Sequence, residues 1–149
     1  MEIEYYNLYT HFVFTTLNRS PVIVEPIRER IEKYMTGIVN NLGSKMYAIY
    51  ANPDHVHFLA SRTPKLSEEL LASTIEKSTE HFIRENGLID ENFRWQKTCS
   101  AFSVSKSDVD KVCKYIMNQP HHHKKVTFTE EYNAMLKYHQ TGLRWLPTK

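Results

Sequence analysis

Two histidines stand one residue apart in the segment NPDHVHFLA, residues 52–60. The segment is typical of a β-strand, in which side chains two positions apart point to the same face. His55 and His57 are therefore predicted on one face, with the apolar Val56 and Phe58 facing a core on the other. Two imidazoles that project together can bind a divalent metal ion, and the alternative is a pair of hydrogen-bonded surface histidines.

A tyrosine and a glutamine stand four residues apart in the segment KVCKYIMNQPHHHKK, residues 111–125. On a helix, Tyr115 and Gln119 would lie one above the other at the edge of the buried stripe, so the hydroxyl of Tyr115 could point outward. A tyrosine at such an edge is commonly just a half-buried aromatic residue. The pair therefore identifies no function by itself.

Together, these four residues would suit the cleavage of a phosphodiester. Mg²⁺ or Mn²⁺ would need oxygen ligands besides the two histidines, and the amide of Gln119 offers one. Tyrosine is a weak nucleophile because its ordinary pKa is about 10. A metal that neutralises charge on the phosphate removes much of that handicap, and attack by Tyr115 would leave a phosphotyrosine and a free hydroxyl.

Three consecutive histidines, His121, His122 and His123, follow the tyrosine. They could belong to a metal site, but adjacent side chains do not converge easily on one ion. The run is therefore interpreted as a polar helix end or a phosphate-contacting surface formed together with Lys124 and Lys125.

The chain resembles the bacterial HUH transposases with a single catalytic tyrosine, the enzymes of the smallest insertion sequences, and also the REP-associated tyrosine transposases. The resemblance covers nearly the whole chain and rests on the segments PDHVHFL, WQ, AFSVS, VCKYIMNQPHHHKKVTF and EEYNAML. It implies that His55, His57 and Gln119 bind Mg²⁺ or Mn²⁺. It implies that Tyr115 forms a 5′-phosphotyrosine on single-stranded or hairpin DNA and leaves a 3′-hydroxyl.

The resemblance also implies a homodimer, in which the tyrosine helix of one protomer completes the partner's site in many members. One segment departs from the family: relatives commonly carry glycines where this chain has KTCSAF, residues 97–102. Because glycine permits backbone conformations that other residues resist, the DNA site could differ there. With the short tail ending in RWLPTK, this keeps an inactive transposase copy as an alternative.

The charge distribution indicates one phosphate-facing surface. Residues 65–92 hold three Lys/Arg against seven Asp/Glu, a net charge of −4, and residues 93–125 hold seven against two, a net charge of +5. A basic segment beside an acidic one favours nucleic-acid binding over one face. The predicted DNA-binding residues are Arg94, Trp95, Lys106, Lys111, His122, His123 and Lys124, with Trp95 available for base stacking.

Periodicity and turn residues predict a β-α-β-β-α-β-α order. The predicted strands are 5–16, 45–51, 55–62 and 99–105, and the predicted helices are 26–42, 67–87, 107–119 and a short last helix capped by Thr129. This order is that of an α+β, ferredoxin-like (split βαβ) fold, with helices mainly on one face of the sheet. The other face would be left open, with His55 and His57 standing on it.

Length and composition limit the classes of protein to which this chain could belong. The chain has 149 residues, 41% of them hydrophobic, which suits one domain over residues 1–149. No apolar run reaches the roughly 18 residues needed to span a bilayer, and the N-terminus lacks the pattern of a signal peptide. We therefore expect a cytoplasmic protein without a membrane partner.

Three rival functions remain open at this point. A non-enzymatic RNA- or single-stranded-DNA-binding module would present Tyr9, Phe12 and Phe14 from the sheet to bases. A metal-independent two-histidine phosphodiesterase could use His11, but HVH lacks a nearby hydroxyl partner. A histidine-triad enzyme would need a third alternating histidine, and position 59 is leucine.

Overall fold

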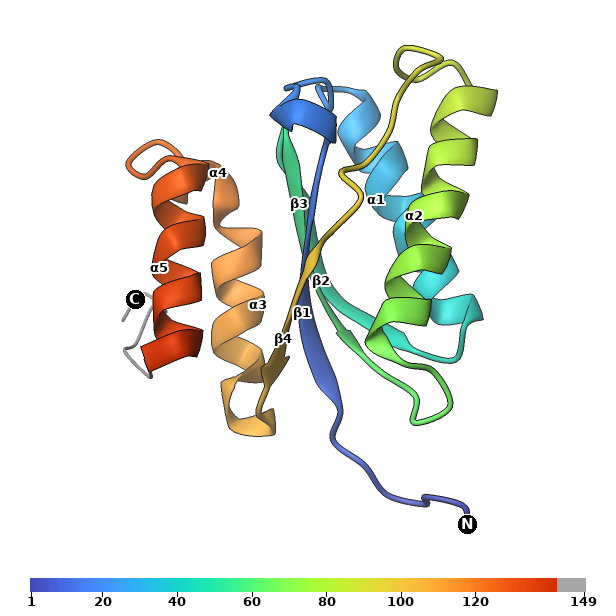
Figure 1. Ribbon diagram of the computed structural model, residues 1–149, viewed down its shortest axis with the longest axis vertical. Helices are drawn as coiled ribbons and strands as arrows, with labels where there is room; N and C mark the ends of the chain where they lie inside the picture. Colours follow the sequence, from blue (N-terminus) through green and yellow to red (C-terminus); the bar gives the residue numbers. More distant parts are fainter. Residues whose placement is uncertain (142–149) are drawn as a thin grey trace.

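Four antiparallel strands pair in the order β2-β3-β1-β4 in the computed structural model, which describes residues 1–141 (Figure 1). The strands are β1 (Tyr9–Thr15), β2 (Lys45–Ala51), β3 (His55–Ser61) and β4 (Ser100–Val104). The helices are α1 (Ile27–Asn41), α2 (Glu68–Glu85), α3 (Val109–Met117), α4 (Gln119–His122) and α5 (Phe128–Thr141), with 3₁₀ turns η1 (Leu17–Arg19) and η2 (Lys106–Asp108). This topology confirms the split βαβ class, whereas the tail segment RWLPTK lies outside the described residues.

The register of the central strands places the histidines as expected. In β3, Val56 and Phe58 belong to the main hydrophobic core, so His55 and His57 project from the opposite face. The neighbouring strand β1 pairs Val13 with His57. The alternation read from the sequence is therefore confirmed.

The main core lies between the sheet and helices α1 and α2, which cover one face in Figure 1. Helix α2 begins as predicted, because the Ser67 hydroxyl accepts a hydrogen bond from the backbone N–H of Leu70 at 3.1 Å. Phe12 and Phe14 are fully buried in this core, so the sheet cannot offer them to bases. Among residues 1–141, no helix is both long and apolar enough to cross a bilayer.

The opposite face of the sheet is also covered. Helices α3, α4 and α5 lie on it, on the left in Figure 1, and two smaller apolar clusters hold α3 and α5 against the strands. His55 and His57 are only 2% and 0% exposed. The prediction of helices mainly on one face therefore needs correction: α1 and α2 cover one face, and the shorter C-terminal helices enclose the histidine face.

The segment predicted as one helix over residues 107–119 is divided. A 3₁₀ turn precedes α3, which ends at Met117, and α4 starts at Gln119 with Pro120 in its first turn. Proline is tolerated there because first-turn N–H groups have no partner within the helix. The break at Asn118 therefore places Tyr115 and the histidine run in different helices.

Helix α5 starts with a reciprocal cap made by Thr127 and Glu130, and not by Thr129 as predicted. The Glu130 backbone N–H donates to the Thr127 hydroxyl at 3.1 Å, and the Thr127 N–H donates to the Glu130 carboxylate at 3.0 Å. This is the S/T-x-x-E capping pattern. It fixes where the first turn of α5 begins, and Glu131 lies in that turn facing the sheet.

Candidate metal centre and tyrosine

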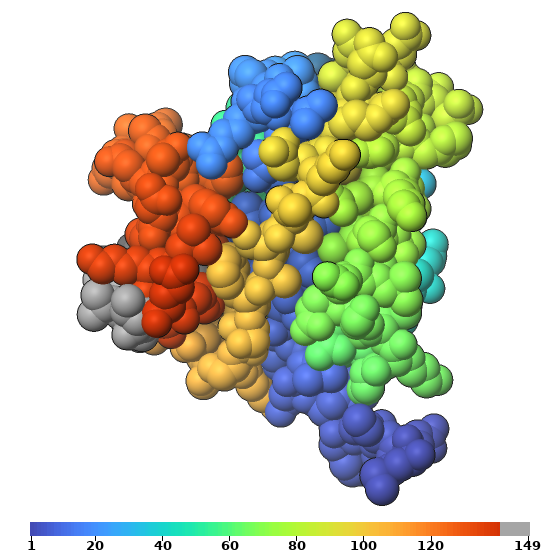
Figure 2. All heavy atoms as spheres, in the orientation of Figure 1, coloured from blue at the N-terminus to red at the C-terminus, as the bar shows by residue number. Residues whose placement is uncertain are grey.

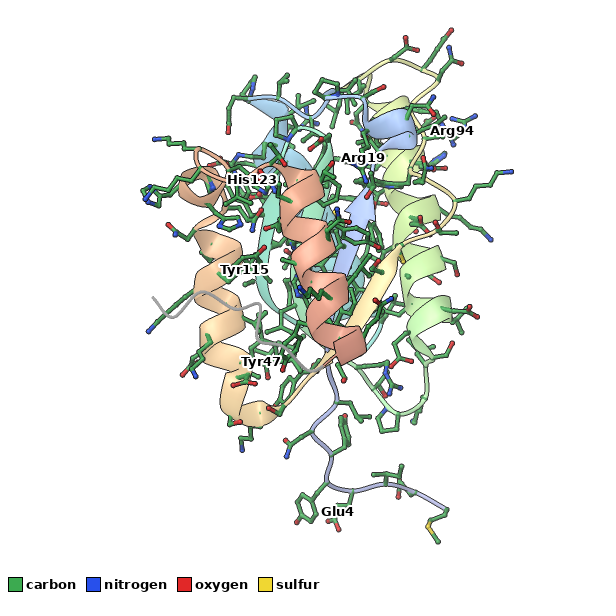
Figure 3. All side chains as sticks on the ribbon, turned by 60° about the vertical axis from the view of Figure 1, so that its left-hand side comes forward. Glu4, Arg19, Tyr47, Arg94, Tyr115 and His123 are labelled. Atoms are coloured by element: carbon green, nitrogen blue, oxygen red, sulfur yellow. The ribbon has the colours of Figure 1, made fainter. Side chains whose placement is uncertain are left out.

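Four potential metal ligands converge on the face of the sheet enclosed by α4 and α5. His55 and His57 come from β3, His123 caps the C-terminus of α4, and Glu131 comes from the first turn of α5. One donor atom of each lies within 4.8 Å of the donor atoms of the others. Figure 3 shows His123 and Tyr115 on the side of the sheet where the C-terminal helices pack.

Each of the three histidines is fixed through its Nδ1 atom. The Nδ1 contacts are Asp54 Oδ1 at 2.7 Å for His55, His11 Nε2 at 2.9 Å for His57, and the Val126 carbonyl at 2.9 Å for His123. Phe128 stacks on the His55 ring at 3.7 Å between centroids. These contacts turn all three Nε2 atoms toward one place.

The carboxylate of Glu131 occupies that place. Its Oε1 atom lies 3.0 Å from Nε2 of His57, 3.2 Å from Nε2 of His123 and 3.5 Å from Nε2 of His55. Its Oε2 atom accepts a hydrogen bond from the Gln119 amide at 2.9 Å. Glu131 is only 4% exposed, so this charge is held almost entirely inside the protein.

Gln119 reaches the cluster, but its amide oxygen is engaged elsewhere. The Asn52 amide donates to Gln119 Oε1 at 3.0 Å, while the Gln119 amide nitrogen donates to Glu131. Asn52 also lies 3.2 Å from His55 Nε2. Gln119 therefore links the loop before β3 to the first turn of α5.

The surroundings shift the pKa of each group in the cluster differently. Burial lowers the pKa of His57, and burial together with the neighbouring His55 lowers the pKa of His123 to about 4. Burial also acts to lower the pKa of His55, but Asp54 and Glu131 outweigh it and leave that pKa raised. Burial opposes ionisation of Glu131, yet its contacts with His55 and His57 keep its pKa below the ordinary value. Burial thus favours the neutral imidazole at His57 and His123, while the contacts of Glu131 favour its carboxylate form.

Tyr115 lies beside this cluster and not at an exposed helix edge. It is only 4% exposed, which corrects the expectation of an outward-pointing hydroxyl. Its ring centroid lies 5.7 Å from that of His57 and 5.3 Å from that of His122. The tyrosine and the histidines of one chain are therefore brought together.

The predicted DNA-binding residues do not share one surface. Trp95 is 3% exposed and packs on Phe14 and Phe93, so it is a core residue and the prediction of base stacking was wrong. The four basic residues of the set, Arg94, Lys106, Lys111 and Lys124, are exposed. Figure 1 places η2 and the start of α3, which carry Lys106 and Lys111, at the opposite end of the sheet from α4.

His122 and His123 face inward, so they do not form the outer phosphate-contacting surface expected from the sequence. Both are only partly exposed, at 22% and 18%, and their Nε2 atoms lie 3.4 Å and 3.2 Å from the Glu131 carboxylate. By contrast His121 is exposed. The Nε2 atom of His123 also lies 3.2 Å from that of His55, which confirms its inward position.

Sequence reasoning missed Glu131 altogether. The available signal was its spacing from Phe128 and Met135, which places a carboxylate on the buried stripe of the last helix. A charged residue on a buried stripe is rarely left without a partner. His11 was considered only for a rival function, although its ring supports His57.

A cavity of about 220 Å³ is lined by Phe128 at the start of α5. It is bordered by the η1 turn, the segment before β4 and the start of α5, segments that lie close together in Figure 2. Thr98, Cys99 and Ser100, from the KTCSAF segment that lacks the family's glycines, line part of it. Phe128 separates the cavity from His55, on whose ring it stacks.

Comparison with known proteins shows which structures and which family this chain resembles. A candidate transposase from Deinococcus radiodurans R1 superposes with a TM-score of 0.62 at 20% identity, over 80% of this chain and 95% of that chain. A REP-associated tyrosine transposase bound to a REP hairpin gives a TM-score of 0.60 at 17% identity, over 99% of this chain and 88% of that one. Both likenesses support the fold, and no curated protein matches the sequence. The family model for IS200-like transposases matches residues 4–119, most of the chain, so this protein belongs to the IS200-like transposase family.

Proposed function

We propose that the protein is a metal-dependent transposase that cleaves and rejoins single-stranded DNA through a 5′-phosphotyrosine. The observation that carries the proposal is the placement of Tyr115 against His57, at 5.7 Å between ring centroids, beside a buried set of metal-ligating groups. A non-enzymatic nucleic-acid module would need none of these residues. That rival is also disfavoured because Phe12 and Phe14 are buried.

The donor groups fit a divalent cation, since three imidazoles and a carboxylate converge within 4.8 Å. His55 and His57 hold Mg²⁺ or Mn²⁺ in this proposal, and the family resemblance gives Gln119 as the third ligand. The ion, when bound, supplies charge neutralisation at the phosphate. Tyr115 forms a bond to phosphorus through its hydroxyl oxygen and gives up its proton, while the bond to the 3′ oxygen breaks and that oxygen takes up a proton.

The proposed substrate is single-stranded or hairpin DNA, as in the structural neighbour bound to a REP hairpin. The exposed Arg94 and Lys124 are proposed phosphate contacts, and Lys124 directly follows His123 of the cluster. The binding affinity should fall steeply with salt, because phosphate contacts release counterions. A homodimer acting in the cytoplasm completes the proposal.

The test is incubation of the protein with labelled hairpin oligonucleotides and Mn²⁺, followed by a denaturing gel. We expect a covalent protein–DNA band that is lost in chelator and is absent with fully paired duplex. The matched variants are Tyr115→Phe, which should give no adduct, and Tyr34→Phe on the opposite face of the sheet, which should behave as wild type. An inactive transposase copy would bind the hairpins without forming adduct.

A further inference from the structure

We infer that His123 and Glu131 are metal ligands, so that the metal centre of this chain consists of three imidazoles and one carboxylate. Gln119 then acts as a positioning residue that holds Glu131. This inference rests on the proposed function for the existence of a metal centre, but it assigns that centre to a different set of side chains.

Contacts at Nδ1 direct the Nε2 atoms of the three histidines toward one point. A metal-binding histidine typically engages its second ring nitrogen with a carboxylate, a carbonyl or another acceptor, which fixes the ring and frees the other nitrogen for the ion. All three histidines show this arrangement, with Nδ1 contacts of 2.7 Å, 2.9 Å and 2.9 Å for His55, His57 and His123. The ring of His123 is therefore fixed through Nδ1 in the same way as the rings of His55 and His57, as expected for a metal ligand.

Three imidazole nitrogens converge on one carboxylate oxygen. His55 Nε2 and His123 Nε2 lie 3.2 Å apart, and both face Glu131 Oε1, as His57 Nε2 does. Three imidazole nitrogens thus share the single oxygen Oε1 of Glu131, and a cation placed among them would be bound by all four groups at once. The convergence is therefore better suited to an ion than to hydrogen bonding alone.

The carboxylate of Glu131 is buried and needs a compensating partner. A carboxylate at 4% exposure is costly unless it is paired or coordinates a metal. The first turn of α5 delivers it, and the Gln119 amide nitrogen fixes its second oxygen at 2.9 Å. Since Gln119 Oε1 accepts from Asn52 at 3.0 Å, the amide oxygen faces Asn52 and leaves the ligand role to Glu131.

This ligand set predicts a metal preference. Three imidazoles and one carboxylate favour transition metals such as Mn²⁺, Co²⁺ or Zn²⁺ over Mg²⁺, which prefers oxygen ligands and retains its waters. We therefore expect the full chain, once stripped of metal, to bind Mn²⁺ and Zn²⁺ at least about 10-fold more tightly than Mg²⁺.

The test is isothermal titration of the metal-free full chain with Mn²⁺ and Zn²⁺. We expect Glu131→Gln and His123→Ala to weaken binding by about 100-fold or more, and Gln119→Ala by about 10-fold. The matched controls are Glu85→Gln on α2 and His121→Ala, whose exposed side chains lie outside the cluster, and these should bind as wild type. Thermal unfolding without metal identifies any variant that fails to fold.

A second measurement needs no variant. Long-range ¹H–¹⁵N NMR of the wild-type imidazoles during Zn²⁺ titration should shift the Nε2 signals of His55, His57 and His123 and leave His121 unchanged. An unshifted His123 signal, or full-affinity binding by folded Glu131→Gln, would overturn the inference. Hairpin adduct formation with Mn²⁺ reports separately on the proposed function, because it depends on Tyr115 and not on which side chains complete the centre.

Discussion

His57 is the residue at which the contacts of the site meet. It has no exposed surface, pairs with His11 at 2.9 Å and with Glu131 at 3.0 Å, and lies against the ring of Tyr115. We expect His57→Ala to abolish DNA cleavage, because the ion is lost at the phosphate, while hairpin binding falls less than about 3-fold. Gel-based cleavage and binding assays measure both, with thermal unfolding as the folding control. Full cleavage by His57→Ala in chelator would exclude a metal role.

At the residue scale, the sequence predicted what lies within one element. His55 and His57 share a face because of the period of a strand, and Tyr115 and Gln119 could be chosen from their spacing. Glu131 could not be chosen, because it lies 74 residues from His57 and reaches it only through the packing of α5. Trp95 was placed wrongly for the same reason: its flanking charges suggested exposure, but its loop turns the ring into the core.

Helix α5 delivers Glu131, so its N-terminal cap should matter to both stability and metal binding. Thr127→Ala removes the hydroxyl that accepts from the Glu130 N–H, and we expect about 1 kcal/mol of destabilisation. Thr129→Ala is the matched control, because Thr129 was the cap expected from the sequence. Urea unfolding of both variants measures their free energies of unfolding. A larger loss of stability for Thr129→Ala than for Thr127→Ala would show that the cap has been misassigned.

Helix α2 carries a carboxyl group that makes stability depend on pH. Burial, with a smaller contribution from Glu80, raises the pKa of Glu76 from 4.5 to about 7. The folded state therefore holds this proton more tightly than the unfolded state, and the associated stability is lost as the pH rises through about 7. After allowance for solvent screening, we expect a loss of about 1 kcal/mol between pH 5 and pH 8.

Glu76→Gln should remove that loss, so its free energy of unfolding should fall less than that of wild type as the pH rises. Glu85→Gln, at an exposed position of the same helix, is the control and should follow wild type. Denaturant unfolding at several pH values gives the comparison. Parallel curves for Glu76→Gln and wild type would contradict the assignment.

At the element scale, the order of strands and helices was predictable because capping residues and periodicity act locally. Ser67 caps α2 as expected. The break at Asn118 was not predicted, because Pro120 is compatible both with the end of one helix and with the first turn of the next. Only contacts with distant residues decide between these, namely that of Gln119 with Asn52 and that of His123 with His55.

At the scale of the whole molecule, both faces of the sheet are covered, and the residues of the proposed site lie within one chain. Tyr115 and His57 of the same protomer are in ring contact, so we expect each protomer of a homodimer to assemble its own site. The check is to mix Tyr115→Phe with His57→Ala protomers under conditions of subunit exchange. We expect no recovery of cleavage, whereas sharing of sites between protomers would restore about a quarter of the wild-type activity.

The identity of the attacking residue tests the central claim most directly. The chain has nine tyrosines, and Tyr115 is distinguished by its place beside His57 and His122. The measurement is peptide mapping by mass spectrometry of the protein trapped on a hairpin oligonucleotide with Mn²⁺. We expect a nucleotide joined through its 5′ phosphate to Tyr115. A nucleotide on any other residue would contradict the proposal that Tyr115 is the attacking residue.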